Sequence, residues 1–205
     1  MENKEFMKTF PLMEHFYTVQ GEGANTGQSA YFLRLGGCDV GCVWCDVKES
    51  WEADLHPQVS VERMVEYVKA AGAVRAVITG GEPCMYDLLP LTNALHVAGV
   101  ACYLETSGAH PISGSWDWIC LSPKKFKAPL KASYEKADEL KVIVYNNHDF
   151  IWAEEQSADV RSSCRRFLQP EYSVFSKMIT PIIEYVKLHP DWTISLQTHK
   201  IMNIP

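Results

Sequence analysis

Short apolar runs alternate along the chain with stretches whose apolar residues follow helical spacing. Seven of the apolar runs predict β-strands, at residues 31–35, 74–79, 100–105, 118–121, 139–145, 166–169 and 193–197. The early runs are almost continuously apolar, which is typical of strands that are buried on both faces of a parallel sheet. The pattern therefore predicts a sheet with a largely interior position.

Helical spacing appears between several of these runs. Ser60 is a suitable N-cap for a helix that Gly72 would end, and Asp87 is a suitable N-cap for a second helix that Gly99 would end. A third helix is expected over residues 149–156.

A fourth helix can be placed in two ways. Thr180 and Pro181 form a good N-cap and first-position pair for a helix that runs to about Leu188. Alternatively, a longer helix begins near Ser173, and Pro181 produces a kink inside it.

Strands that alternate with helices predict an α/β fold with a mostly parallel sheet. The number of strands and helices is below the eight strand–helix units of a closed barrel. We therefore expect a partial TIM-like barrel with few helices. Since no linker or internal repeat interrupts the chain, we expect a single domain over residues 1–205.

Polar and glycine-rich segments follow the predicted strands. They lie at residues 37–46, 79–83, 105–108, 122–124, 169–170 and 197–200. Ligands of parallel α/β folds bind at the carboxyl ends of the strands. These segments therefore predict one site on the rim of the barrel.

Composition limits the classes of partner that the chain can bind. The formal net charge of -6 argues against a nucleic-acid surface, and the densest basic stretch, residues 124–127, is too short to change this. No apolar run is long enough to span a bilayer, and the N-terminal MENKEFMKTF lacks the apolar core of a signal peptide. We expect a small-molecule partner, and reduced thiols in the cytoplasm.

Three of the seven cysteines lie close together in the segment GCDVGCVWCD, as Cys38, Cys42 and Cys45. Thiolates suit zinc or an iron–sulfur cluster. Zinc would need a fourth ligand, for which Asp46, His56 or a distant cysteine is available. A four-iron cluster held by three cysteines instead leaves one iron free to bind a substrate or cofactor. The remaining interpretation is three unrelated buried cysteines.

The C-x3-C-x2-C spacing, with Trp44 before the last cysteine, resembles the signature of radical S-adenosylmethionine enzymes. The segment Gly80-Gly81-Glu82-Pro83 is similar to the GGEP motif of that superfamily. The resemblance implies that the three cysteines hold a [4Fe-4S] cluster whose open iron binds S-adenosylmethionine. It also implies that Trp44 lies near the adenosyl group and that Glu82 and the glycine backbone hold the methionyl amino group.

Longer stretches are similar to one family within that superfamily, the 7-carboxy-7-deazaguanine synthases. They are residues 16–23, 105–108, 122–124, 169–170 and 197–205. The resemblance implies conversion of 6-carboxy-5,6,7,8-tetrahydropterin to 7-carboxy-7-deazaguanine with loss of ammonia, a step toward queuosine. It further implies a homodimer and a flavodoxin or ferredoxin as electron donor.

Several residues suit a pterin chemically. Gln20 offers a donor and an acceptor, Glu22 accepts only, and the backbone of Gly21 allows close approach of a flat ring. Arg34 is the one charge in an apolar strand, and its guanidinium fork suits a carboxylate. A buried ion pair is the equally good structural explanation of Arg34.

The resemblance implies two sets of contacts. Substrate contacts are expected from Val19, Gln20, Gly21, Glu22, Arg34, Thr79 and the carboxylate of Pro205. S-adenosylmethionine contacts are expected from Trp44, Gly81, Glu82, Ser122, Pro123, Lys124, Gln169 and Pro170, and also from Glu171 and Tyr172. The candidate acids and bases for ammonia loss are Glu22, Glu105 and His199.

One position departs from the family pattern. Family members usually carry Thr after the Cys-Asp pair, where its hydroxyl helps to bind magnesium, whereas this chain has Val47. Valine has no oxygen for a hard cation. We expect weak or absent magnesium dependence, unless Asp46 or Ser50 compensates.

Two alternatives to the synthase remain at this stage. A radical activase that acts on a protein would share the cysteine spacing and the GGEP motif. A metal- or redox-binding module without catalysis would share the cysteines alone.

Overall fold

The computed structural model describes residues 8–205, so most of the N-terminal stretch that argued against an export signal lies outside the described residues. One nine-stranded sheet dominates the fold, with strand order β3-β1-β2-β4-β5-β6-β7-β8-β9. The strands are β1 (Thr9–Val19), β2 (Ser29–Leu35), β3 (Gln58–Ser60), β4 (Arg75–Gly80), β5 (Ala101–Thr106), β6 (Trp118–Leu121), β7 (Glu139–Val144), β8 (Arg165–Pro170) and β9 (Trp192–Ile194).

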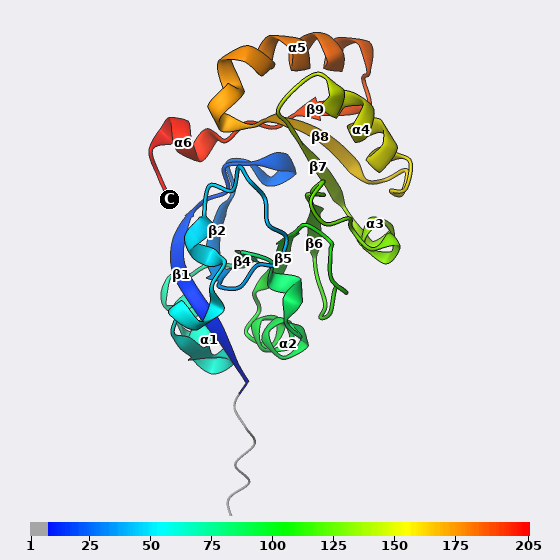
Figure 1. The fold of residues 1–205 in the computed structure, drawn as a ribbon. Coiled ribbons are helices and arrows are strands. Elements are labelled where there is room, and N and C mark those ends of the chain that lie inside the picture. Colours follow the sequence, from blue (N-terminus) through cyan, green and yellow to red (C-terminus); the bar gives the residue numbers. More distant parts are fainter. Residues whose placement is uncertain (1–7) are drawn as a thin grey trace, which may run out of the picture.

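In the sheet, β2 pairs in parallel with β4, and β4 to β9 pair in parallel in sequence order, whereas β1 pairs antiparallel with both β2 and β3. Within residues 8–205 the sheet has two edges, at β3 and β9, so the barrel is not closed. The helices lie around the outside of the curved sheet, except for the C-terminal one, which lies apart from the others (Figure 1). They are α1 (Val61–Ala70), α2 (Leu89–Val97), α3 (Lys131–Lys136), α4 (His148–Ser157), α5 (Phe175–Leu188) and α6 (Thr198–Met202). The predicted partial barrel is confirmed.

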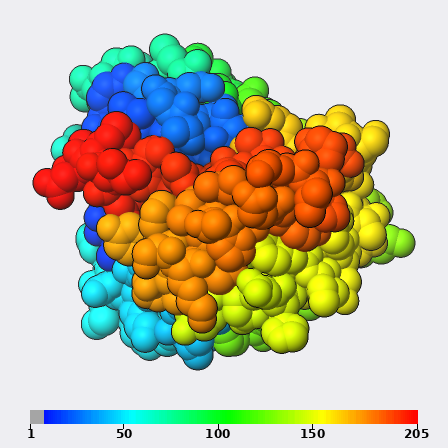
Figure 2. Space-filling model, turned by 90° about the horizontal axis from the view of Figure 1, so that it is seen from above, coloured from blue at the N-terminus to red at the C-terminus, as the bar shows by residue number. Residues whose placement is uncertain are grey.

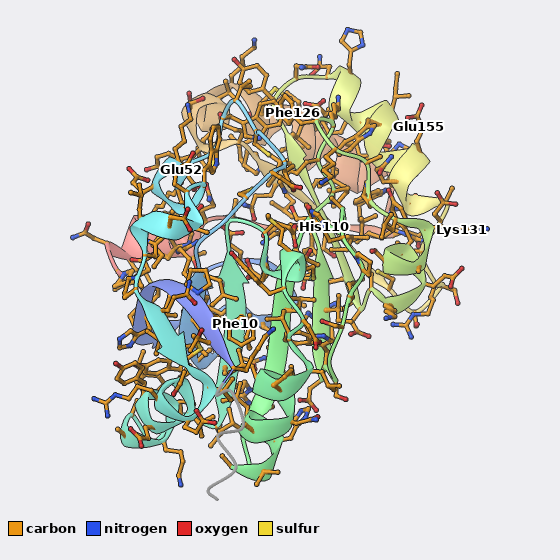
Figure 3. The ribbon with its side chains drawn as sticks, turned by 60° about the horizontal axis from the view of Figure 1, so that its bottom comes forward. Phe10, Glu52, His110, Phe126, Lys131 and Glu155 are labelled. Atoms are coloured by element: carbon orange, nitrogen blue, oxygen red, sulfur yellow. The ribbon has the colours of Figure 1, made fainter. Side chains whose placement is uncertain are left out.

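Two apolar clusters join the outer face of the sheet to the helices. The first lies under α1 and α2 and includes Phe10, which is labelled in Figure 3. The second lies under α4 and α5 and includes Leu140, Val142 and Val144 of β7. Burial of this apolar surface provides the main stabilisation of the fold.

Alternate residues of the same strands face the other way. In β7, Glu139, Lys141 and Ile143 point away from the helix-covered cluster. In β2, Leu33 and Leu35 join the helix-covered cluster, whereas Phe32 and Arg34, which alternate with them, do not. The strands are therefore buried on both faces, but the inner face carries the polar residues.

The predicted helices agree with the structure, apart from the start of one of them. The Ser60 hydroxyl accepts from the Arg63 amide at 3.3 Å and caps α1 as expected. The Asp87 carboxylate accepts from the Leu89 amide at 3.2 Å, but α2 begins at Leu89, one residue later than a cap at Asp87 implies. Pro181 lies inside α5, so the longer-helix alternative is the correct one.

The N- and C-terminal elements were predicted poorly. Strands β1 and β3 were missed because the exposed positions of β1 carry polar residues and β3 has three residues. The last predicted strand, 193–197, ends at Ile194, and residues 198–202 form α6. His199 therefore belongs to a helix.

Candidate active site

A cavity of about 590 Å³ opens at the carboxyl ends of the parallel strands. Most of the predicted site residues line it: Gln20, Glu22, Arg34, Cys38, Cys42, Trp44, Cys45, Thr79, Gly81, Glu105, Ser122, Lys124, Gln169, Pro170, Glu171, Tyr172, His199 and Pro205. Among the described residues, Val19, Gly21, Glu82 and Pro123 are the predicted contacts that do not line it. Segments that are far apart in sequence therefore meet at one rim of the sheet.

The cysteine loop connects β2 to the rim. Gly37 and Gly41 adopt φ values of 98° and 74°, which favour glycine. The turn after β4 is locked to this loop, because the Glu82 amide donates to the Gly37 carbonyl at 2.8 Å. A Cβ on Gly81 would lie 2.3 Å from the same carbonyl oxygen, so this close approach requires glycine.

The three thiols fit a cluster better than a single zinc ion. Zinc at about 2.3 Å from each sulfur would bring the sulfurs within about 4 Å of one another. Over residues 8–205, the one group of three such ligand atoms that all lie within 4.8 Å is formed by His96, Cys102 and Asp117, elsewhere in the fold. At least one pair of the loop sulfurs therefore lies more than 4.8 Å apart, which is wider than three sulfurs on one zinc ion would be.

The proposed fourth zinc ligands are engaged elsewhere. The Asp46 carboxylate lies 3.2 Å from the Lys200 ammonium. The His56 ring nitrogen Nε2 lies 2.8 Å from the Glu49 carbonyl. Burial raises the pKa of the Cys38 and Cys42 thiols, so a bound cation has to stabilise their thiolate forms.

Glu82 lies just behind the cavity wall and does not line the cavity. The residue is 1% exposed, and its carboxylate accepts from the Thr106 hydroxyl at 2.5 Å. It also accepts from the backbone amide and hydroxyl of Ser107, at 2.8 and 2.5 Å. Glu82 thus fastens the end of β5 to the turn after β4, beneath the cavity wall.

A network of charges forms one wall of the cavity. The Lys141 ammonium of β7 lies 2.5 Å from a Glu22 carboxylate oxygen and 3.9 Å from one of Glu105. The Gln20 amide donates to Glu105 at 2.9 Å, and the Gln197 amide donates to Glu22 at 2.9 Å. The wall thus presents two carboxylates whose positions are fixed by neighbouring side chains.

The charge state of Glu22 follows from this network. Burial alone would raise the pKa of its carboxyl, but the Lys141 ammonium and the Gln197 amide outweigh burial and lower the pKa to about 2. Glu22 is therefore a permanent acceptor at neutral pH.

Arg34 forms an ion pair, but the pair is not the buried one that the structural explanation required, because the Arg34 and Glu14 side chains are 20% and 43% exposed. Its Nε donates to the Glu14 carboxylate on the neighbouring strand at 2.6 Å. A guanidinium carries five N–H donors, and this contact uses one of them. Arg34 still lines the cavity.

Aromatic rings flank the polar wall. Phe16 and Phe32 stack at a centroid distance of 5.4 Å and line the cavity. Trp44 meets Phe126 edge-on at 4.8 Å and stacks with Tyr145 at 6.0 Å, beside the cysteine loop. Flat apolar surfaces therefore lie next to fixed hydrogen-bonding groups.

The C-terminal segment covers part of the site. In Figure 2 it lies between the N-terminal strands and the region of α5. The Thr198 amide donates to the Gly21 carbonyl at 2.9 Å, and Lys200 pairs with Asp46 of the cysteine loop. A Cβ on Gly21 would lie 2.3 Å from His199, which explains why this position is glycine.

Sequence reasoning gave no role to four lining residues that matter here: Lys141, Gln197, Phe16 and Phe32. Of these, Gln197 and Phe16 lie in segments 197–200 and 16–23, which the sequence did single out. Lys141 carried a usable signal, because it is the one cation in an apolar strand, as Arg34 is in β2. Phe16 and Phe32 carried none, since an aromatic residue in a strand is usually part of the core.

No helix among residues 8–205 has the length and apolar character that crossing a bilayer requires.

Comparison with known proteins agrees with this geometry. The family model described as the Radical SAM superfamily matches residues 33–121. The chain is 55% identical to a 7-carboxy-7-deazaguanine synthase of Flavobacterium psychrophilum, covering 95% of this chain and 92% of that one. It is 45% identical to a 7-carboxy-7-deazaguanine synthase of Synechocystis, covering 96% and 94%.

A solved structure matches as well. The crystal structure of QueE from Escherichia coli superposes with a TM-score of 0.83 at 34% identity, covering 92% of this chain and 93% of that chain. The cysteine loop, the glycine turn locked to it and the near full-length similarity lead to the same conclusion. The chain belongs to the 7-carboxy-7-deazaguanine synthase family of the radical SAM superfamily.

Proposed function

We propose that this chain converts 6-carboxy-5,6,7,8-tetrahydropterin to 7-carboxy-7-deazaguanine, with loss of one ammonia and no net oxidation. The observation that supports this most directly is the cavity, in which three cysteines of one loop share a space with two fixed carboxylates and a guanidinium. When bound, the [4Fe-4S] cluster and S-adenosylmethionine supply the carbon radical that removes a hydrogen atom from the substrate.

The cofactor side of the cavity is assigned to the rim loops. Cys38, Cys42 and Cys45 would hold the cluster. Trp44, Gly81, Ser122, Lys124, Gln169 and Pro170 would surround S-adenosylmethionine, since all of them line the cavity. The Lys124 ammonium donates to the hydroxyl and carbonyl of Ser122, at 2.6 and 2.8 Å. This contact holds Lys124 toward the cavity and available to a carboxylate.

The substrate side is assigned to the charged wall. The pyrimidine edge of a pterin carries N–H donors, which suit the carboxylates of Glu22 and Glu105. Gln20 would contact the ring edge as well, and Thr79 lies nearby on the rim. Arg34 would pair with the carboxylate of the substrate. Phe16 and Phe32 provide the apolar surface on which a flat ring packs.

Loss of ammonia requires that a proton reach the leaving nitrogen. Glu22 is a poor donor, because its low pKa keeps it ionised at neutral pH. Glu105 and His199 remain as the candidates, and both line the cavity. The pH–rate profiles of Glu105→Gln and His199→Gln separate the two candidates. The variant that lacks the proton donor should lose the fall in turnover at high pH that deprotonation of the donor causes, and the other variant should keep it.

Magnesium would have a weak role in this chain. Val47 lines the cavity, and its side chain offers no oxygen. The Ser50 hydroxyl is fully buried and donates to the Val47 carbonyl at 2.7 Å, and Asp46 is paired with Lys200. Neither replacement ligand is free to bind a hard cation without rearrangement.

The expected partners are a second copy of the chain, as in a homodimer, and an electron donor of the flavodoxin or ferredoxin class. All seven cysteines are free thiols, which suits the reducing cytoplasm.

The decisive experiment is an anaerobic assay of the reconstituted protein with the carboxylated pterin. We expect 7-carboxy-7-deazaguanine to form, with 5′-deoxyadenosine detectable. Cys38→Ala should lose both the cluster absorption and all cleavage of S-adenosylmethionine. Turnover that survives in Cys38→Ala, or cofactor cleavage in the wild type without pterin conversion, would contradict the proposal.

Removal of Pro205 tests the activase alternative. Pro205 lines the cavity, so a small-molecule enzyme should lose most pterin conversion on its deletion. An activase that acts on a protein surface should be little affected. The cluster absorption of the truncated protein serves as the control for intact folding.

A further inference from the structure

A second group of metal-ligand side chains lies toward the opposite end of the sheet from the cavity. Over residues 8–205, His96, Cys102 and Asp117 are the one set of three whose ligand atoms all lie within 4.8 Å of one another. His96 is in the last turn of α2, Cys102 is the second residue of β5, and Asp117 directly precedes β6. The proposed function gives none of these residues a role.

This group is separate from the cavity. None of its three residues lines the cavity, whereas Thr106 at the carboxyl end of β5 does. Four residues of strand, at about 3.3 Å each, put Cys102 about 13 Å from Thr106. A ligand bound by the group would therefore not compete with the ligands of the cavity.

Asp117 holds the group together. Its Oδ2 atom accepts from the Cys102 amide at 2.8 Å and lies 2.8 Å from the His96 ring nitrogen Nε2. Burial alone would raise the pKa of the Asp117 carboxyl, but the His96 ring and the Cys102 amide outweigh burial and lower this pKa. Asp117 is therefore an ionised oxygen ligand at neutral pH.

The Cys102 thiol is the buried member of the group. The residue is 0% exposed, and its sulfur lies 3.8 Å from the carbonyl oxygens of both Thr92 and Val100. A thiol is a weak donor, so these contacts hold its proton weakly. Burial raises the pKa of the thiol to about 12, and a bound metal ion is what would replace the proton at neutral pH.

The surroundings of the group favour a cation. The C-terminal end of α2 carries partial negative charge, and the Asp117 carboxylate adds a full one. The side chains of His96 and Asp117 are 34% and 47% exposed, so an ion can enter from solvent. Small rotations of these two side chains would widen their contact to about 3.4 Å, the spacing of two oxygen or nitrogen ligands on one zinc ion.

We propose that His96, Cys102 and Asp117 bind one zinc ion, with water as the fourth ligand. Thiolate, imidazole and carboxylate together suit zinc, whereas magnesium and calcium select oxygen ligands alone. Binding releases the thiol proton to solvent and changes no oxidation state. The ion would tie the end of α2 to the starts of β5 and β6, which stabilises the folded chain.

The first test measures zinc on the anaerobic, cluster-loaded protein after dialysis against buffered, micromolar free zinc. Thermal unfolding is followed on the same samples. The variants are His96→Gln and Asp117→Asn, at exposed positions that tolerate substitution. His148→Gln, at an exposed position of α4, is the matched control.

The wild type and the control should each hold about one zinc ion per chain beyond the iron, and their Tm should rise with the zinc concentration. In His96→Gln and Asp117→Asn the zinc affinity should fall by at least about tenfold. A wild type that holds no zinc would overturn the proposal. Variants that hold as much zinc as the wild type would also overturn it, because the ion would then be adventitious.

Cobalt(II) tests the thiolate directly. The triple variant Cys38→Ala/Cys42→Ala/Cys45→Ala lacks the loop thiols, so iron–sulfur absorption does not mask its spectrum. Added cobalt(II) should produce the near-ultraviolet absorption of a thiolate–cobalt bond, and further substitution of Cys102→Ser should abolish it. A triple variant that is folded by circular dichroism but lacks this absorption would overturn the assignment of Cys102.

If the triple variant does not fold, the zinc content of the cluster-loaded protein decides the question alone. None of these readouts depends on turnover. A failure of the zinc site is thereby distinguishable from a failure of the proposed reaction.

Discussion

Replacing Lys141 by methionine should destabilise the protein far more than a typical substitution does. Methionine keeps much of the length of the side chain but removes the ammonium that lies 2.5 Å from Glu22 and 3.9 Å from Glu105. Lys141 is 4% exposed, so water solvates its surroundings poorly. The substitution leaves buried negative charge without its counter-ion.

The size of the loss in the free energy of unfolding follows from the shift in the pKa of Glu22. The fold lowers this pKa from 4.5 to about 2. At about 1.4 kcal/mol for each pH unit, ionised Glu22 stabilises the folded state by about 3 kcal/mol. This contribution is fully present above pH 4.5 and is lost as the pH falls toward 2. Lys141→Met removes it, so the free energy of unfolding at pH 7 should fall by about 3–5 kcal/mol, as for other broken buried pairs.

The loss of stability in Lys141→Met should also depend on pH, and it should be smaller at low pH. Without Lys141, burial raises the pKa of Glu22 above 4.5, so the folded variant takes up a proton as the pH falls. The variant then gains stability between pH 8 and pH 5, by up to about 1.4 kcal/mol for each pH unit. The wild type does not change through Glu22 in this range. The gap between the two proteins should therefore narrow at low pH.

Urea unfolding followed by circular dichroism measures both effects. Glu22→Gln combined with Lys141→Met should recover much of the stability, because the Glu22 charge is removed along with its partner. A loss below about 1 kcal/mol in Lys141→Met, or a loss that is the same at pH 5 and pH 8, would refute the reasoning.

Three further substitutions test separate parts of the structure. Ser60→Ala removes the cap of α1 and should lower the free energy of unfolding by about 1 kcal/mol in urea, whereas Ser60→Asp should not. Gly81→Ala places a Cβ 2.3 Å from the Gly37 carbonyl oxygen and so displaces the cysteine loop, and the iron content after reconstitution should fall sharply. An iron content equal to that of the wild type would show that the loop accommodates the Cβ without losing the cluster. Val47→Thr restores a hydroxyl to the cavity wall and should increase the stimulation of turnover by magnesium; an unchanged magnesium response would show that this position does not bind the ion.

The sequence was sufficient to predict the parallel strands and the rim that they form. Strand β7 illustrates the reason: Leu140, Val142 and Val144 make it an apolar run, which signals burial on both faces. Strand β1 gave no such signal, because it pairs near the edge of the sheet and exposes polar side chains such as Glu14. Short or edge elements depend on tertiary pairing more than on their own composition.

The site was predictable where one short segment carries the chemistry. The three cysteines lie within eight residues, so their proximity needed no tertiary structure. The pairing of Lys141 with Glu22 joins residues 119 positions apart, and no local pattern records it. The orientation of Glu82 could not be foreseen either, because the hydroxyls of Thr106 and Ser107 capture its carboxylate across two strands.

The contacts between the two ends of the chain have a consequence for biosynthesis. The walls of the cavity join residues 21 and 22 to residues 197 and 198, and the cysteine loop to Lys200. During translation residues 21, 22 and 46 leave the ribosome long before residues 197–200 exist to contact them. This wall of the cavity can therefore form only when synthesis of the chain is almost complete.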